Sequence, residues 1–235
     1  MRGQGSHEAK MRRTRVLKTL LGITLLAATL APAAGQATPA TEQVPRKTST
    51  PYSGDLTIFD YPDRAQKLHI DQVMDLLGIT PGKTVADIGA GSGWFTVRAA
   101  KRVTPTGKVF AVDINPDAVT YIQKRAQKDG LFNITTILGS ADDAGLPPSS
   151  VDAVLLLKTY HEVAKPVELM RNLRRALRPG ARVGVIDRSG NGSDHGVPMK
   201  VVISEMESAG YRLQSEQADL VKDDKMDYFL IFIGN

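Results

Sequence analysis

Short apolar runs alternate with amphipathic stretches between residues 84 and 209, and no other feature of the sequence constrains the fold as much. The apolar runs have the length of strands, and the stretches between them have the apolar spacing of helices. Because a helix between two strands lets those strands run parallel, this pattern predicts a parallel sheet with helices on both faces. The runs and stretches fall at residues 84–88, 95–103, 108–114, 116–128, 134–138, 151–157, 167–177, 182–186 and 197–209.

Both ends of this pattern carry further elements. Apolar residues at near-helical spacing over 68–77 predict one helix ahead of the first strand. After the last helix, 211–221 and 226–233 are predicted as two strands with no helix between them. Because a parallel crossover needs a dozen or more residues, the polar turn at 222–225 makes these strands antiparallel. We therefore expect an α/β domain over 54–235: a doubly wound, Rossmann-like sheet of seven strands, mostly parallel with a C-terminal antiparallel hairpin.

The first 37 residues have the layout of a secretory signal peptide, with residues 1–10 as an extension upstream of it. A basic segment at 11–18 precedes an apolar run at 20–31, and small residues follow as cleavage options. The apolar run is shorter than the roughly 20 residues that span a membrane, while a buried helix and an uncleaved anchor are the alternatives. Residues 38–53, rich in Thr, Pro and Ser, predict a flexible linker. We expect a protein of the bacterial periplasm, or a secreted one, without a membrane span after cleavage.

The excess positive charge lies in the leader and not in the predicted domain. The chain has a formal charge of +5, and residues 1–37 carry six basic side chains against one acidic side chain. The remaining residues hold 24 basic and 24 acidic side chains, so the composition argues against nucleic acid as a partner. The absence of cysteine excludes disulfide scaffolds, thiol nucleophiles and thiolate zinc sites.

Three glycines alternate with other residues directly after the first predicted strand. Gly89, Gly91 and Gly93 let a ligand lie against bare backbone, and the N-terminus of the next helix offers free N–H groups to an anion. The dinucleotide fingerprint G-x-G-x-x-G would need its last glycine where Trp94 stands. The P-loop pattern G-x-x-x-x-G-K-S/T is absent from the sequence. The loop therefore favours neither a nicotinamide or flavin enzyme nor a P-loop enzyme.

Acidic residues follow the second and third predicted strands. Asp113 ends the second strand, where a carboxylate can accept both hydroxyls of a ribose. As an alternative, Asp113 caps the helix that starts at Pro116. Asp142 follows the third strand and could accept a hydrogen bond from the exocyclic amine of adenine. The alternative for Asp142 and Asp143 is a solvated acidic turn.

Five motifs follow one another along the predicted domain, at residues 85–93, 110–113, 139–147, 151–157 and 177–181. Together with the C-terminal hairpin they resemble the class I S-adenosylmethionine-dependent methyltransferases, over about residues 52–235. The resemblance implies S-adenosylmethionine as cofactor, with the glycines along its methionine portion and Asp87 supporting its ammonium. It also implies that Asp113 holds the ribose, Ile114 packs on the adenine and Asp142 meets the adenine amine. The cofactor-binding residues implied in full are Asp87, Gly89, Ala90, Gly91, Gly93, Asp113, Ile114, Ala141, Asp142 and Lys158.

Candidate groups for the methyl acceptor follow the fourth and fifth strands, at the sheet edge where open α/β folds bind ligands. His161 could be a general base because imidazole exchanges a proton near neutral pH, and Tyr160 could stack on or hydrogen-bond the acceptor. A histidine at a strand end can equally be satisfied by a backbone carbonyl. Asp187 and His195 are candidates for substrate binding, with an ordinary surface loop as the alternative.

The function we expect is methyl transfer to an unidentified small-molecule acceptor. A catalytically silent member of the same fold, acting as a ligand sensor or interaction module, is the alternative. Export favours it, because the methyl donor is made in the cytosol. A hydrolase using Ser189 and His195 lacks the G-x-S-x-G elbow. No histidine is followed by another four residues later, so the sequence predicts no metal site, and it indicates no particular oligomeric state.

Overall fold

The computed structural model describes residues 52–191 and 194–234. The predicted signal peptide and all but the last two residues of the predicted linker lie outside these ranges. Within the described ranges, no helix combines the length and apolar character needed to cross a membrane. The elements in chain order are η1 (Leu56–Asp60), α1 (Arg64–Lys67), α2 (Ile70–Leu76), β1 (Thr84–Ile88), α3 (Trp94–Arg102), β2 (Lys108–Asp113), α4 (Pro116–Lys128), β3 (Ile134–Leu138), β4 (Val151–Leu157), η2 (Tyr160–Glu162), α5 (Pro166–Leu173), η3 (Arg174–Ala176), β5 (Leu177–Asp187), α6 (Met199–Ser208), β6 (Tyr211–Glu216), η4 (Ala218–Asp224) and β7 (Tyr228–Gly234).

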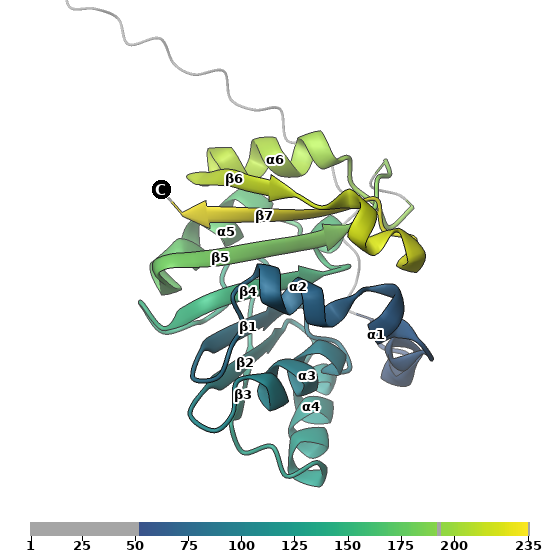
Figure 1. Ribbon diagram of the computed structural model, residues 1–235, viewed down its shortest axis with the longest axis vertical. Helices are drawn as coiled ribbons and strands as arrows, with labels where there is room; N and C mark the ends of the chain where they lie inside the picture. The colour runs from purple at the N-terminus through teal and green to yellow at the C-terminus, as the bar shows by residue number, and fades with distance from the viewer. Residues whose placement is uncertain (1–51, 192–193, 235) are drawn as a thin grey trace, which may run out of the picture. The chain divides into compact units, whose positions relative to one another are not determined.

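The strands form one seven-stranded sheet in the order β3-β2-β1-β4-β5-β7-β6 (Figure 1). Neighbouring strands from β3 to β5 pair in parallel, whereas β7 runs antiparallel to both β5 and β6. The predicted α/β fold, mostly parallel with an antiparallel C-terminal hairpin, is confirmed. The strand order reverses between β1 and β4, and open α/β sheets bind ligands in the crevice outside the carboxyl ends of the strands at such a point.

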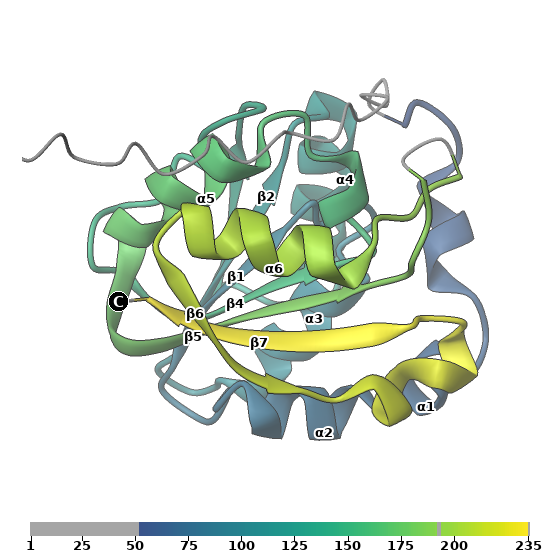
Figure 2. The same ribbon diagram turned by 90° about the horizontal axis from the view of Figure 1, so that it is seen from above.

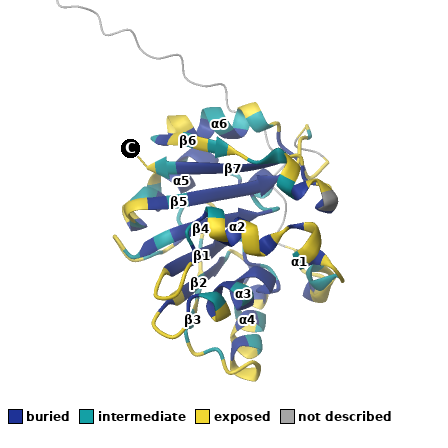
Figure 3. Ribbon diagram, viewed as in Figure 1, coloured by how far each residue is buried: buried dark blue, intermediate teal, exposed yellow. Residues whose placement is uncertain are grey.

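Helices cover both faces of the sheet, as predicted. α5 and α6 lie over one face, and α1 and α2 lie on the other side (Figure 2). The core under α5 and α6 includes Met170, Val202 and Met206, while the opposite core includes Val73 from α2 and Trp94 from α3. Because both faces are covered, β1 is buried at all of its positions and β7 at most of its own (Figure 3).

The cap of α4 decides one of the alternatives for Asp113. Asn115 is the N-cap residue, and its side chain accepts a hydrogen bond from the backbone N–H of Asp117 at 2.9 Å. Pro116 follows at the first helical position, where its fixed φ suits the helix. The cap of this helix is therefore Asn115, and Asp113 is left for another role.

The C-terminal hairpin differs from the prediction. β6 ends at Glu216, and the 3₁₀ helix η4 occupies the residues that were expected to continue the strand and form a polar turn. Val221 is fully buried in the core beside α2 and α3, which explains why its apolar character resembled that of a strand. Asp224, expected in an exposed turn, is buried and pairs with the Lys158 ammonium at 2.6 Å.

Tyr52, two residues ahead of the predicted domain, contacts that domain. The backbone carbonyl of Tyr52 accepts a hydrogen bond from the side-chain amide of Asn115 at 2.7 Å. The rings of Tyr52 and Phe59 meet edge to face with their centroids 5.5 Å apart. Tyr52 is one of the last two residues of the predicted linker, and it contacts the domain through these two interactions.

Candidate functional site

A cavity of about 820 Å³ opens where the strand order of the sheet reverses. Ile88 at the end of β1, Asp113 at the end of β2 and Leu157 at the end of β4 all line it. Its volume falls in the range of roughly 300–1,000 Å³ that is typical of small-molecule sites. The cavity therefore lies at the sheet edge where the sequence placed the cofactor and the acceptor.

The glycine loop after β1 leaves no room for a side chain at Gly89 and would strain one at Gly91. Gly89 has a φ of 72°, and a Cβ on it would lie 2.2 Å from Cγ2 of Thr159, the second residue after β4. Gly91 has a φ of 55°, and its N–H donates to Oδ2 of Asp113 at 2.8 Å. Both glycines are in the left-handed region that other residues rarely adopt, and both line the cavity. The loop thus presents bare backbone to a ligand.

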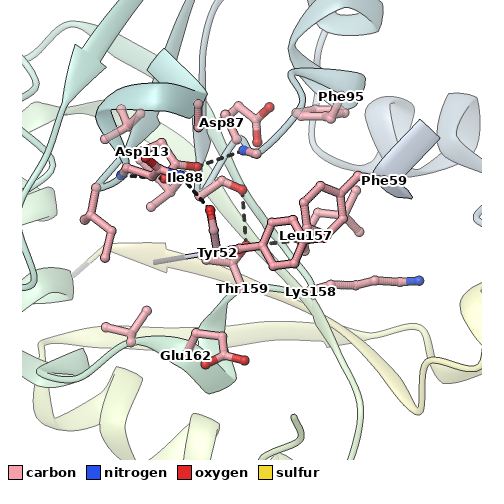
Figure 4. A pocket seen from close by; sticks show the side chains of 18 of the residues that line it. Tyr52, Phe59, Asp87, Ile88, Phe95, Asp113, Leu157, Lys158, Thr159 and Glu162 are labelled. Carbon is pink, nitrogen blue, oxygen red and sulfur yellow. Dashed lines mark hydrogen bonds between the residues drawn. The ribbon is translucent and has the colours of Figure 1, made fainter. Parts of the chain in front are cut away.

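Asp113 is held in a fixed orientation at the end of β2. Its Oδ2 accepts from Gly91, and its Oδ1 accepts from the backbone N–H of Asn115 at 2.9 Å. A carboxylate oxygen can accept more than one hydrogen bond, so both oxygens keep capacity for a ligand. Figure 4 shows Asp113 on the same side of the cavity as Asp87. This geometry suits the two neighbouring hydroxyls of a ribose.

Asp87 is buried at the end of β1 and lines the cavity. Burial raises the pKa of its carboxyl to about 6, against a partial lowering by a hydrogen bond from Thr96 and by the charge of Arg64. The Thr96 hydroxyl donates to Oδ2 of Asp87 at 2.6 Å. Burial makes the ionised form of this carboxyl costly. A ligand cation at the cavity wall would offset that cost and favour the carboxylate.

The other predicted cofactor residues divide into two groups. Ala90, Ile114, Ala141 and Lys158 line the cavity together with Asp87, Gly89, Gly91 and Asp113. Gly93 and Asp142 are not among the described residues that line it. Gly93 caps α3 below the loop. The Asp142 side chain is 41% exposed and pairs with the Lys165 ammonium at 2.9 Å, so the adenine-loop residues at the cavity are Ser140 and Ala141.

Lys158 lines the cavity, and its ammonium is engaged by two other side chains. The ammonium lies 2.6 Å from Oδ2 of Asp224 and donates to the hydroxyl of Tyr61 at 2.8 Å. Burial lowers the pKa of Lys158, while Asp224 opposes that effect. Figure 4 shows the Lys158 side chain extending away from Asp87 and Asp113. The charge of Lys158 is therefore paired with Asp224.

The acceptor side is built on a buried pair, His161 and Asp187. Nδ1 of His161 lies 2.7 Å from Oδ1 of Asp187, and the backbone N–H of His161 donates to Oδ2 at 3.0 Å. The backbone N–H of Arg188 donates to Oδ1 at 2.9 Å. Because the carboxylate accepts at Nδ1, the neutral ring carries its proton there and leaves Nε2 as an acceptor. Asp187 is fully buried, so it acts through His161 and does not line the cavity itself.

Tyr160 is not placed to contact an acceptor. It is fully buried and belongs to the core under α5 and α6, and it is absent from the described residues that line the cavity. The next residues, His161 and Glu162, point into the cavity instead, because the 3₁₀ turn η2 sends successive side chains in different directions. The expected role for Tyr160 in acceptor binding is therefore corrected to a packing role.

Glu162 and His195 complete a group that local spacing did not reveal. Oε1 of Glu162 lies 3.1 Å from Nε2 of His161 and 2.5 Å from Nδ1 of His195. The three side chains line the cavity and bring one possible ligand atom each within 4.8 Å of one another. The sequence predicted no metal site because no histidines were paired along a helix. The fold instead brings η2 and the loop after β5 together, and these two segments supply the three side chains.

Segments ahead of the sheet also line the cavity, and sequence reasoning missed them. Tyr52, Phe59, Tyr61 and Arg64 all contribute, and Figure 4 shows Tyr52 and Phe59 beside Thr159. The segment is tied to the domain through Asp60, which accepts from the Ser92 hydroxyl and pairs with Arg125, both at 2.8 Å. Only the cluster of aromatic residues at 52–61 could have indicated such a role.

Comparison with known proteins agrees with this geometry. A family model described as a methyltransferase domain matches residues 79–228. The chain belongs to the class I S-adenosylmethionine-dependent methyltransferase family. A crystal structure of a SAM-dependent methyltransferase from Aquifex aeolicus has a TM-score of 0.65 and 26% sequence identity to this methyltransferase-family chain, covering 75% of it and 95% of the Aquifex chain.

Two curated relatives are methyltransferases by name. The ubiquinone/menaquinone biosynthesis C-methyltransferase UbiE of Hydrogenovibrio crunogenus is 26% identical over 156 residues, which is 66% of this chain and 59% of the relative. The arsenite methyltransferase of Halobacterium salinarum is 29% identical over 109 residues, which is 46% of this chain and 28% of the relative. This chain thus spans less than two thirds of the length of each of these two relatives.

The raised pKa of Asp87 predicts a pH-dependent cost to stability. Its folded pKa of about 6 lies above its ordinary value of 3.8, so the folded state loses stability from this group as pH rises through 6. Asp87→Asn keeps the hydrogen-bond acceptor for Thr96 and removes the charge. From pH 5 to pH 7.5, the free energy of unfolding of Asp87→Asn should rise relative to wild type by about 1 kcal/mol. Urea unfolding at both pH values measures this, and an unchanged difference would contradict the buried, costly carboxylate.

Proposed function

We propose that this protein transfers the methyl group of S-adenosylmethionine to a small-molecule acceptor held beside His161. The observation that carries the proposal is the arrangement of the cavity. Asp87 and Asp113 lie on one side with the glycine loop, and Glu162 lies across from them (Figure 4). His161 is the neighbour of Glu162 and lines the same cavity. A cofactor bound along Asp87, Asp113 and the glycine loop would direct its methyl group toward Glu162 and His161.

The cofactor side fits S-adenosylmethionine in three respects. The bare backbone at Gly89 and Gly91 accommodates the methionine portion, where any side chain would collide or be strained. The buried Asp87 carboxylate suits the ammonium, whose charge would offset the cost of ionising it. The held carboxylate of Asp113 suits the ribose hydroxyls, and Ile114, 46% exposed, offers an apolar surface for the adenine.

The protein contributes to the reaction mainly through alignment. The bound cofactor supplies a methyl group on a cationic sulfur, which leaves as a neutral thioether and needs no proton donor. Residues around the cavity therefore have to hold the two reactants in line, a contribution of up to roughly 7–11 kcal/mol to lowering the barrier. The rings of Tyr52 and Phe59 line the cavity and offer apolar surface to the two reactants (Figure 4).

The acceptor loses its proton to Nε2 of His161 in this proposal. Oδ1 of Asp187 lies 2.7 Å from Nδ1 of His161 and accepts the hydrogen bond from that nitrogen. This contact fixes the orientation of the ring and stabilises the imidazolium that forms. The backbone N–H groups that donate to Asp187 keep its carboxylate in place. A catalytically silent protein needs no such buried pair at its cavity, so the His161–Asp187 pair favours an enzyme over that alternative.

Two observations support a small acceptor. Cofactor and acceptor have to share a cavity of about 820 Å³, and the residues after position 37 carry equal numbers of basic and acidic side chains, unlike a nucleic-acid-binding protein. One relative, the arsenite methyltransferase, is named for a small acceptor.

Cofactor binding should stabilise the protein and depend on Asp113. S-adenosylhomocysteine, the product form of the cofactor, should raise the free energy of unfolding by about 2.7 kcal/mol at 100 times its dissociation constant. Asp113→Ala should remove most of this stabilisation because it removes the ribose acceptor. Asp142→Ala is the matched control, because this acid is paired with Lys165 outside the cavity, and it should behave as wild type. Absence of ligand stabilisation in the wild type would rule out the proposed cofactor site.

The His161–Asp187 pair should control catalysis more than cofactor affinity. His161→Gln should lower the rate of methyl transfer by about 10²–10⁴-fold for acceptors that must lose a proton, a typical contribution of a general base. Its affinity for S-adenosylhomocysteine should stay near wild type. Transfer of labelled methyl groups to a panel of phenols and alcohols, which must lose a proton, measures the rate. Tyr160→Phe is the control, since that ring is buried outside the cavity, and equal rates for His161→Gln and wild type would exclude His161 as the base.

We also propose that the protein is exported, on the basis of the signal-peptide layout of residues 1–37. Fractionation of a bacterial host should then find a form shortened by roughly the first 35 residues outside the cytoplasm. N-terminal sequencing identifies the cleavage position. Replacing Arg12, Arg13 and Arg15 by Glu reverses the charge ahead of the apolar run and should retain the full-length chain in the cytoplasm. A full-length cytoplasmic wild-type protein would contradict export.

A further inference from the structure

We propose that His161, Glu162 and His195 bind a divalent transition-metal ion at the acceptor side of the cavity. The first two residues belong to η2 after β4, and His195 belongs to the loop after β5. The three side chains line the cavity, and one ligand atom from each lies within 4.8 Å of the other two. Two imidazoles and a carboxylate are a ligand set of catalytic zinc sites, which keep one further position open.

The distances between the ligand atoms suit an ion. Zinc bonds to nitrogen and carboxylate oxygen at about 2.0–2.2 Å, so tetrahedral ligand atoms lie roughly 3.3 Å apart. Oε1 of Glu162 lies 3.1 Å from Nε2 of His161 and 2.5 Å from Nδ1 of His195. The carboxylate oxygen is thus close to both imidazole nitrogens, and small side-chain rotations bring the three atoms to coordination distance.

Asp187 orients His161 for coordination. A metal-bound histidine commonly donates its other ring N–H to a carboxylate, which fixes the tautomer and raises the basicity of the ligand. Asp187 has this relation to His161, with Oδ1 2.7 Å from Nδ1, and the carboxylate is itself held by two backbone N–H groups. Nε2 is left with its lone pair on the cavity side, beside Glu162. Asp187 is therefore a positioning residue for the ion.

The backbone at His195 is held in an uncommon conformation that places the ring at the cluster. His195 has a φ of 56°, in the left-handed region that favours glycine. Arg188 holds this conformation, because its guanidinium donates to the carbonyl of His195 at 2.9 Å and also to that of Asp194. The ring lies edge to face with His161, 5.9 Å between centroids, and its side chain is 71% exposed. An ion can therefore reach the cluster from solvent.

The proposed ion would act on the acceptor and not on the cofactor. Its open position faces the cavity, where an acceptor oxygen could coordinate and lose its proton more readily. In the metal-bound protein Nε2 of His161 is a ligand, so the ion takes over from His161 the task of favouring the ionised acceptor. This last step rests on the proposed methyl transfer, whereas the binding of the ion does not. The ligand set favours zinc and its transition-metal neighbours over magnesium or calcium, which prefer oxygen.

The test measures metal binding without cofactor or acceptor. Chelator-treated, tag-free full-length protein is titrated with Zn²⁺ by calorimetry, and Co²⁺ replaces Zn²⁺ for absorption spectra that report coordination geometry. We expect one ion per chain in the wild type. His195→Ala and Glu162→Gln should lose this binding, and Asp187→Asn should weaken it about 10–100-fold, as other changes to groups behind a metal ligand do. His69→Ala, an exposed histidine far along the chain from the cluster, should bind as wild type.

The outcomes separate this proposal from the proposed function. No zinc binding by the wild type, or equal binding by wild type, His195→Ala and Glu162→Gln, overturns the metal site even if the protein binds S-adenosylhomocysteine. Zinc binding that is lost in both variants supports the site even if no methyl transfer is found. Circular dichroism and urea unfolding, measured in parallel, show that His195→Ala and Glu162→Gln are folded.

Discussion

The site depends on the close packing of the glycine loop between the ends of β2 and β4. On one side, the N–H of Gly91 donates to Asp113 at 2.8 Å; on the other, Gly89 leaves no room for a side chain against Thr159. This packing is possible because β1 lies between β2 and β4, where the strand order reverses. The glycine loop, Asp113 and the residues after β4 can therefore line one cavity. In the proposed function, this shared lining is what brings the cofactor and the acceptor together.

The sequence predicted the order of elements in the parallel half of the fold and several of their bounds, although β5 begins at Leu177 and not at the predicted residue 182. β1, β3, β4 and α4 begin and end as expected, because buried apolar runs alternate with amphipathic helices and the connections carry glycine, proline or polar residues. The C-terminal region was less predictable. Apolar residues such as Val221 pack on the core from a 3₁₀ helix, and periodicity does not separate that case from a strand. Asp224 is fixed by Tyr61, a partner 163 positions earlier, which no local pattern reveals.

The cofactor side was more predictable than the acceptor side for a physical reason. Gly89, Gly91 and Asp113 are fixed by strand ends and by hydrogen bonds within one βαβ unit, so their spacing carries the information. The acceptor side joins residues from two separate loops, and within a 3₁₀ turn a shift of one position moves a side chain from the core to the cavity. Tyr160 and His161 are neighbours that differ in this way, and the pairing of His161 with His195 follows only from the fold.

The central claim is that one cavity holds the adenosyl cofactor along Asp113 and turns its sulfur toward the residues after β4. A crystal structure of the protein with S-adenosylhomocysteine tests this claim most directly. The account predicts both ribose hydroxyls on the Asp113 carboxylate, the ligand's ammonium near Asp87, and the sulfur facing His161 and Glu162. A complex in which the ribose lies away from Asp113, or in which the sulfur faces away from His161, would contradict it.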